Sequence, residues 1–310
     1  MNWILVALFA YFLVGLEVIL DKFLLTSKKV SHPAVYAFYS GLLSSFALVL
    51  IPFGVKFIPL GLAAKYIFFG FIFVYGILCL FFAINKSEAS RVIPVVGAIV
   101  PIVTYLISHF FSLEYLKAHQ ILGIVILVSG GLLISFDLPI RLNKKKFFLG
   151  FFPSVLAGIL LGVSLAGLKH FYVQEGAFIN VFMWSRLGLV IGAISLLVNP
   201  DWRKIIFHSS GNFKNPKKEN IKTGLLFVVN KGLGGAGSIL TNYAVALGSV
   251  TIVSAMVSVE YVFIFLMSLV FSVRFPRIFQ EEGSFWDVVQ KIAAILIIAA
   301  GLILVSIKKI

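Results

Sequence analysis

Four charged side chains lie inside segments of the sequence that are otherwise apolar. Two are acids and two are bases: Glu17, Glu260, Arg186 and Lys231. A charge at the centre of a bilayer costs about 2.5–3.5 kcal/mol even on the mildest scale, so such residues usually face a cavity or one another. They can neutralise pairwise as salt bridges between helices, or they can line a wet site for a charged or zwitterionic solute. We take all four as candidate substrate-binding residues.

A polar face follows Lys231 along the same apolar segment. Ser238 and Asn242 come seven and eleven residues later, which places all three on one side of a helix. Gly234 and Gly235 lie between them, and small residues let helices approach closely. Asn242 is therefore a further candidate for substrate binding, and the two glycines are candidates for helix packing or a hinge.

Two aromatic residues complete the candidate substrate site. Tyr261 follows Glu260 directly and belongs to a serine-bearing stripe. Trp184 lies two residues before Arg186 and could form a cation–π contact with its guanidinium group. Serine stripes in membrane helices are more often contacts between helices than ligands of a substrate, so both interpretations remain open.

One motif suggests a dinucleotide cofactor, and we reject it. Residues 232–237 match G-x-G-x-x-G, and Glu260 lies roughly at the distance of the acid that binds the ribose. That fingerprint needs a preceding strand and a helix N-terminus directed at the pyrophosphate. Here the glycines lie in the middle of an apolar segment, so we expect no cofactor. The five histidines show no metal-ligand spacing, and we expect no metal either.

The composition excludes an ordinary soluble protein. Of the 310 residues 60% are hydrophobic and only 12% are charged, whereas about a quarter are charged in soluble domains. The single cysteine, Cys79, excludes an internal disulfide. The net charge of +14 comes from basic residues scattered over short loops and helix ends, which favours anionic lipid headgroups over nucleic acid.

Hydropathy predicts an all-α integral membrane protein with ten transmembrane helices. No cleavable signal is evident at the N-terminus, so the first apolar run is taken as a span. The predicted spans are 3–20, 34–53, 66–84, 92–111, 120–136, 148–168, 177–198, 223–247, 250–272 and 289–306.

The fourth span contains two prolines, Pro94 and Pro101. Each removes a backbone hydrogen bond, which a bilayer tolerates only where neighbouring helices or a wet cavity satisfy the carbonyl groups. We therefore expect these prolines at a hinge or a packed contact. The connection to the fifth span is short, and this predicts that spans 92–111 and 120–136 are antiparallel neighbours.

The chain also repeats itself weakly. Residues 8–22 resemble 155–169, and residues 90–103 resemble 251–264. Each half holds five spans, an odd number, so the second half must enter the membrane from the opposite side. The result is an inverted-topology repeat, which places a binding site between the halves near the middle of the membrane.

This pattern resembles a known family. Two five-span halves, with SEASRVIPVVGAIVP at 87–101 and SLEYLKAHQILG at 112–123, are similar to the EamA-like family of the drug/metabolite transporter superfamily. The resemblance implies two EamA-like five-helix repeats, at 1–140 and 141–310. It implies a secondary transporter, often an exporter of amino acids or other small metabolites. The family often has an arginine after the aromatic residue of the second span, and Arg186 is its candidate counterpart in the second half.

We therefore predict a secondary transporter, rather than an enzyme, that exports small metabolites such as amino acids by alternating access. A carboxyl group of Glu17 or Glu260 could couple transport to protons. A flippase for a lipid-linked sugar is the alternative, and a lateral opening between helices would favour it. An enzyme acting on lipids would need an acid–base constellation, for which His109, Glu114 and His119 are the nearest candidates without a specific spacing.

The expected partners are a small-molecule substrate and the lipid bilayer, with the protein a monomer or homodimer in the plasma (inner) membrane. Basic residues gather in the loops after the odd-numbered spans, and the positive-inside rule then places both termini outside. The family resemblance implies cytoplasmic termini instead.

Overall fold

A computed structural model confirms an all-α integral membrane protein. Within the residues it describes, all regular secondary structure is helical, and nine segments are long and apolar enough to cross a membrane. The described residues are 2–25, 32–87, 89–135, 144–211, 220–275 and 285–307.

The helices follow the predicted spans closely. In chain order they are α1 (Trp3–Leu25), α2 (Pro33–Leu43), the 3-10 helix η1 (Ser44–Phe53), α3 (Leu60–Lys86), α4 (Ala89–Phe110), α5 (Ala118–Ser135), α6 (Lys144–Glu175), α7 (Phe178–Ser195), the 3-10 helix η2 (Leu196–Val198), α8 (Pro200–Gly211), α9 (Asn220–Leu247), α10 (Val250–Ala255), α11 (Val257–Arg274) and α13 (Phe285–Ser306). The predicted eighth span is α9. It is not among the nine most apolar segments, but its 28 residues suffice to cross roughly 30 Å of hydrocarbon.

The helices form two compact units, and each unit combines helices from distant parts of the sequence. The first unit contains residues 1–29, 115–142 and 216–310, and the second contains residues 30–114 and 143–215. The first unit therefore holds α1, α5, α9, α10, α11 and α13, and the second holds α2, η1, α3, α4, α6, α7, η2 and α8.

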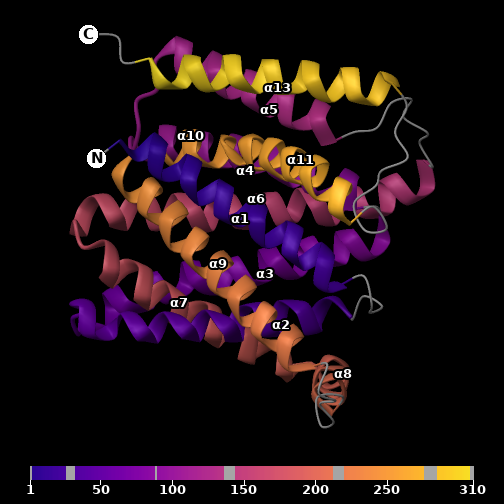
Figure 1. The fold of residues 1–310 in the computed structure, drawn as a ribbon. Helices are drawn as coiled ribbons and strands as arrows, with labels where there is room; N and C mark the ends of the chain where they lie inside the picture. The colour runs from indigo at the N-terminus through magenta and orange to yellow at the C-terminus, as the bar shows by residue number, and fades with distance from the viewer. Residues whose placement is uncertain are drawn as a thin grey trace. The chain divides into compact units, whose positions relative to one another are not determined.

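In the first unit, α1 packs against α9 and α11, and α5 lies along α13 (Figure 1). Glycines make the second contact close. A Cβ atom on Gly123 would lie 3.0 Å from the carbonyl oxygen of Gly301, and a Cβ atom on Gly301 would lie 3.0 Å from that of Gly123. The two backbones touch at this point, because neither residue has a side chain.

In the second unit, α6 packs against α3 and α4, and α7 packs against α2 and α3. α4 is continuous through Pro94 and Pro101, and both prolines are buried, so this structure has no break in the predicted fourth span. The hydroxyl of Thr104 donates to the carbonyl oxygen of Pro101 at 3.0 Å. The prolines thus lie at a packed contact.

The fourth and fifth predicted spans belong to different units, so their expected pairing stays a prediction. α4 has its main partner, α6, in the second unit, whereas α5 packs against α13 in the first unit. A short connection restricts the distance between two helix ends, but it does not decide which neighbour each helix packs against.

The break in a predicted span occurs elsewhere, in the ninth. Met256 separates α10 from α11 although this span contains no proline. Three residues before this break, the carbonyl oxygen of Val253 accepts a hydrogen bond from the hydroxyl of Tyr11 on α1 at 2.6 Å. The connection predicted as a polar loop at 199–222 also contains a helix, α8, whose Trp202 and Ile206 pack with the core around α2 and α3.

The glycine contact between α5 and α13 can be tested by adding bulk. We expect Gly123→Leu to lower the thermal midpoint of the purified protein in detergent, because overpacking of a tight contact costs about 1–3 kcal/mol. Gly61→Leu is the matched control, since nothing lies within 4 Å of where its Cβ would be. Equal midpoints for the two variants would contradict the close approach.

Candidate functional site

The predicted site residues lie in both units. Glu17 is on α1, and Lys231 and Asn242 are on α9. Glu260 and Tyr261 are on α11, and all five of these residues belong to the first unit. The other two predicted residues, Trp184 and Arg186, lie on α7 in the second unit.

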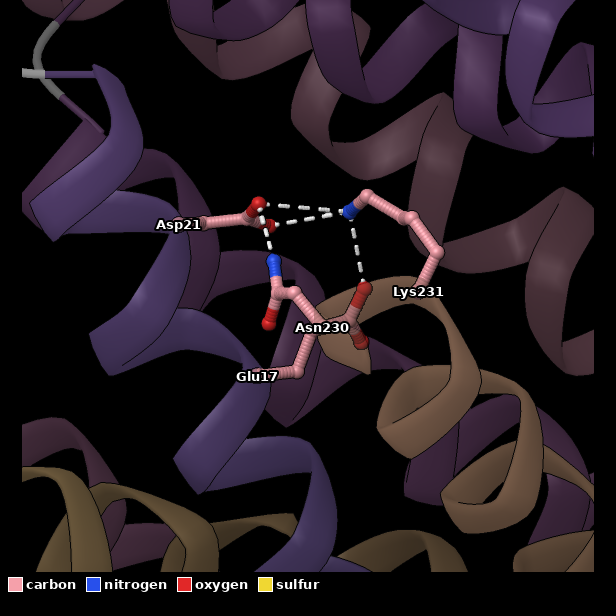
Figure 2. Close-up of polar contacts among 4 residues, drawn as sticks. All are labelled: Glu17, Asp21, Asn230 and Lys231. Atoms are coloured by element: carbon pink, nitrogen blue, oxygen red, sulfur yellow. Dashed lines mark hydrogen bonds and ion pairs between the residues drawn. The ribbon is translucent and has the colours of Figure 1, made fainter. Parts of the chain in front are cut away.

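Lys231 joins α9 to α1 through two carboxylates. Its Nζ lies 2.9 Å from Oε1 of Glu17, and 3.3 and 3.1 Å from Oδ1 and Oδ2 of Asp21 (Figure 2). Glu17 and Asp21 are four residues apart, so they lie on the same face of α1, one helical turn apart. The structure thus brings two of the predicted residues, Glu17 and Lys231, into one ion-paired group.

Asn230 completes this group, which we call the Lys231 cluster: Glu17, Asp21, Asn230 and Lys231. Asn230 is fully buried, and its Nδ2 donates to Oδ1 of Asp21 at 2.7 Å (Figure 2). Its own Oδ1 is buried and has no hydrogen-bond partner among the described residues. An unsatisfied buried carbonyl oxygen is costly, so this acceptor suggests that something else binds here.

The cluster carries one negative charge in excess. Glu17 and Asp21 contribute two formal negative charges and Lys231 one positive charge. The side chains of Glu17, Asp21 and Lys231 are 20%, 32% and 32% exposed, so the group is partly shielded but not sealed. Glu260 lies near enough to Glu17 for the two carboxyl groups to interact electrostatically.

Gly234 makes room for the Glu17 carboxylate. A Cβ atom at this position would overlap the carboxyl group of Glu17, so the predicted packing role of Gly234 fits the structure. Gly235 was predicted to have the same role, but nothing lies within 4 Å of where its Cβ would be. The two glycines are neighbours on a helix and therefore point about 100° apart. The G-x-G-x-x-G motif at 232–237 lies inside the continuous helix α9 and lacks the geometry of a dinucleotide site.

The remaining predicted residues of the first unit have other surroundings. Asn242 is buried, and its Nδ2 donates to the carbonyl oxygen of Ser238 one turn earlier on α9, at 2.9 Å. Glu260 forms no hydrogen bond or ion pair within the described part of the chain, although its backbone oxygen lies against Gly15 of α1. Tyr261 interacts electrostatically with Glu260.

In the second unit, Arg186 and Trp184 face different neighbours. The guanidinium carbon of Arg186 lies 4.2 Å from the centre of the Phe182 ring. The Nε1 of Trp184 donates to the carbonyl oxygen of Lys56 at 3.3 Å. The expected cation–π partner of Arg186 is therefore wrong. Residues two apart on a helix point to nearly opposite sides, whereas residues four apart share a face.

One buried charge was not recognised in the sequence. Lys169 comes directly after the predicted sixth span, 148–168, but it lies within α6 and is 5% exposed. It interacts electrostatically with Glu114, in the loop after α4. Lysine near the end of an apolar segment is normally an interfacial residue, and α6 continues beyond it to Glu175. Within the described residues, no group of three or more His, Cys, Asp or Glu is placed to hold a metal ion.

The fold and the charged cluster define a multi-pass membrane protein with a polar site between its helices. The sequence model of the EamA-like transporter family matches residues 1–136. The match lies within the drug/metabolite transporter superfamily and confirms the family resemblance of this part of the sequence. It favours a membrane transporter of the drug/metabolite type.

Solved structures support the fold. Twenty-eight chains match. One of them, a crystal structure of a protein, is 15% identical with a TM-score of 0.69, and the match covers 99% of this chain and 99% of that chain. No curated protein matches the sequence.

The role of Gly234 gives a direct test of the cluster. We expect Gly234→Ala to lower the thermal midpoint of the protein in detergent, because the added methyl group displaces the Glu17 carboxylate and weakens its ion pair with Lys231, at a cost of up to about 1 kcal/mol. Gly235→Ala is the control and leaves the midpoint unchanged or slightly higher, since alanine favours a helix. The geometry is refuted if the two substitutions act alike.

Proposed function

We propose that the protein is a secondary transporter that carries a small polar metabolite, such as an amino acid, across the plasma (inner) membrane by alternating access. The observation that carries this proposal is the Lys231 cluster. An ion pair within membrane helices is costly to maintain, and such groups mark pathways for substrates and ions. Its three charged side chains are 20–32% exposed, so they are not sealed inside the protein.

Alternating access requires two related halves, and packing within each unit supports an inverted repeat. In the first unit, a Cβ on Gly237 of α9 would lie 2.7 Å from Val14 of α1. In the second unit, a Cβ on Gly76 of α3 would lie 2.9 Å from Leu161 of α6. If the first span corresponds to the sixth and the third to the eighth, these two contacts are equivalent.

A second pair of contacts has the same register. Gly15 follows Val14 on α1, and its Cβ would lie 3.4 Å from Phe263 and 3.6 Å from the carbonyl oxygen of Glu260 on α11. On α6, Gly162 follows Leu161 in the same way, and it faces α4. A Cβ atom on Gly162 would lie 2.8 Å from Val103 and 3.3 Å from the carbonyl oxygen of Val100.

The agreement extends over three helices in each unit. Glu260 and Phe263 are three residues apart, as are Val100 and Val103. One register therefore relates α1, α9 and α11 to α6, α3 and α4. This supports two five-helix repeats, at 1–140 and 141–310, with opposite orientation in the membrane.

The same register identifies what differs between the repeats. The α6 residue that corresponds to Glu17 is Ser164, whose hydroxyl donates to the carbonyl oxygen of Phe69 on α3 at 2.8 Å. The residue that corresponds to Lys231 on α3 is Gly70. The ion pair therefore joins a helix of each repeat within the first unit, and a neutral contact occupies the equivalent place in the second unit.

The carboxyl groups near the cluster are the candidates for proton coupling. Glu17 is held by Lys231, whereas Glu260 can take up or release a proton without breaking an ion pair in the described part of the chain. In the second unit, the guanidinium group of Arg186 lies over the Phe182 ring, and Arg186 remains a candidate ligand for an anionic group of a substrate.

Transport can be measured with the purified protein in proteoliposomes. We expect uptake of radiolabelled amino acids that increases when a pH gradient is imposed. Glu17→Gln or Glu260→Gln should reduce the gradient-driven flux about tenfold or more, since a neutral amide cannot exchange a proton. Asp201→Asn, on the exposed surface of α8, is the control for loss of a carboxylate elsewhere. Coupling through these residues is excluded if both variants keep the full gradient-driven flux.

A further inference from the structure

We propose that the solute bound at the Lys231 cluster carries a primary ammonium group, which pairs with Glu17 or Asp21 in competition with Lys231. This inference rests on the proposed function and specifies the chemical class of its substrate. It follows from the charge, the hydrogen-bonding capacity and the geometry of the cluster.

The charge of the cluster favours a cation. Two carboxylates share a single ammonium group, which leaves one negative charge within the membrane helices. An anionic solute would increase the excess charge, whereas one positive group on a solute cancels it.

The hydrogen-bonding capacity of the cluster points the same way. An ammonium group has three donors and no acceptor, and the Lys231 ammonium makes three contacts with carboxylate oxygens. The buried Oδ1 of Asn230 still lacks a donor among the described residues. Each carboxylate oxygen can accept more than one hydrogen bond. The cluster therefore has acceptors in excess, and the ligand that satisfies them must bring donors.

The geometry already accommodates an ammonium group. The Lys231 Nζ lies 2.9–3.3 Å from three carboxylate oxygens, which is the contact that an alkyl ammonium solute would make (Figure 2). Lys231 thus acts as a tethered competitor of the substrate. Asn230 is a positioning residue, since its amide holds Asp21 towards the same point.

Three probes of equal chain length separate the possible ligands: n-butylammonium, n-butanol and butyrate. Binding is measured as thermal stabilisation and by calorimetry on the full-length protein in nanodiscs. For the wild-type protein we expect butylammonium to bind at least about tenfold more tightly than the neutral and anionic probes, and sodium chloride at equal ionic strength to give no comparable stabilisation. Stronger binding of butyrate, or equal stabilisation by sodium, overturns the proposal without any variant.

Variants then give effects of opposite sign. Lys231→Met removes the competitor and should tighten butylammonium binding about tenfold, whereas Glu17→Gln and Asp21→Asn should weaken it about tenfold. Lys65→Met, on the exposed surface of α3, is the control for loss of a lysine. Loss of butylammonium binding in a folded Lys231→Met protein would show that Lys231 binds the ligand directly, and this contradicts competition.

The outcomes also separate this inference from the proposed function. Selective ammonium binding without transport in proteoliposomes would refute the transporter but keep the cation site. Transport of neutral or anionic solutes, with no preference for butylammonium, would refute the ammonium inference and leave the transporter in place.

Discussion

The interaction between Lys231 and the two carboxylates of α1 constrains the whole first unit. It can form only where α9 and α1 lie close together, and glycines at 234 and 237 provide that closeness. Removal of one partner from a shielded ion pair leaves a charge without compensation, which is more costly than never having buried the pair. The two helices are therefore held in one register by electrostatics as well as by packing.

The helix packing around this ion pair has an equivalent within the second unit, but the charged residues do not. Val14 against Gly237 has an equivalent in Leu161 against Gly76, yet the position of Glu17 corresponds to Ser164. Close helix packing depends on the backbone shape and on small residues. It can therefore persist when one neighbouring side chain changes from charged to neutral. Two units can thus have matching helix contacts while the ion pair of Lys231 occurs in the first of them.

The sequence predicted the helices and part of the site because both depend on the cost of polarity in a bilayer. Hydropathy identified the spans, and the same cost singled out Glu17 and Lys231 as charged residues within them. It did not single out Asp21 or the neutral Asn230. Lys169 near the end of an apolar run gave no sign that α6 continues past it. The choice of helix neighbours was also beyond reach, because it depends on glycine contacts between distant segments. The pairing of Arg186 with Phe182, in contrast, was available from helical periodicity.

An ion pair that is partly exposed is well suited to alternate between two states. Its contacts of 2.9–3.3 Å favour the closed arrangement, and its 20–32% exposure keeps solvent near enough to compensate the charges as they separate. A ligand shifts such an equilibrium only through a difference in affinity between the two states. Under the proposed function, a solute that replaces Lys231 at a carboxylate would bind only an arrangement in which this contact is open. The energy of that exchange would then couple solute binding to a separation of α9 from α1.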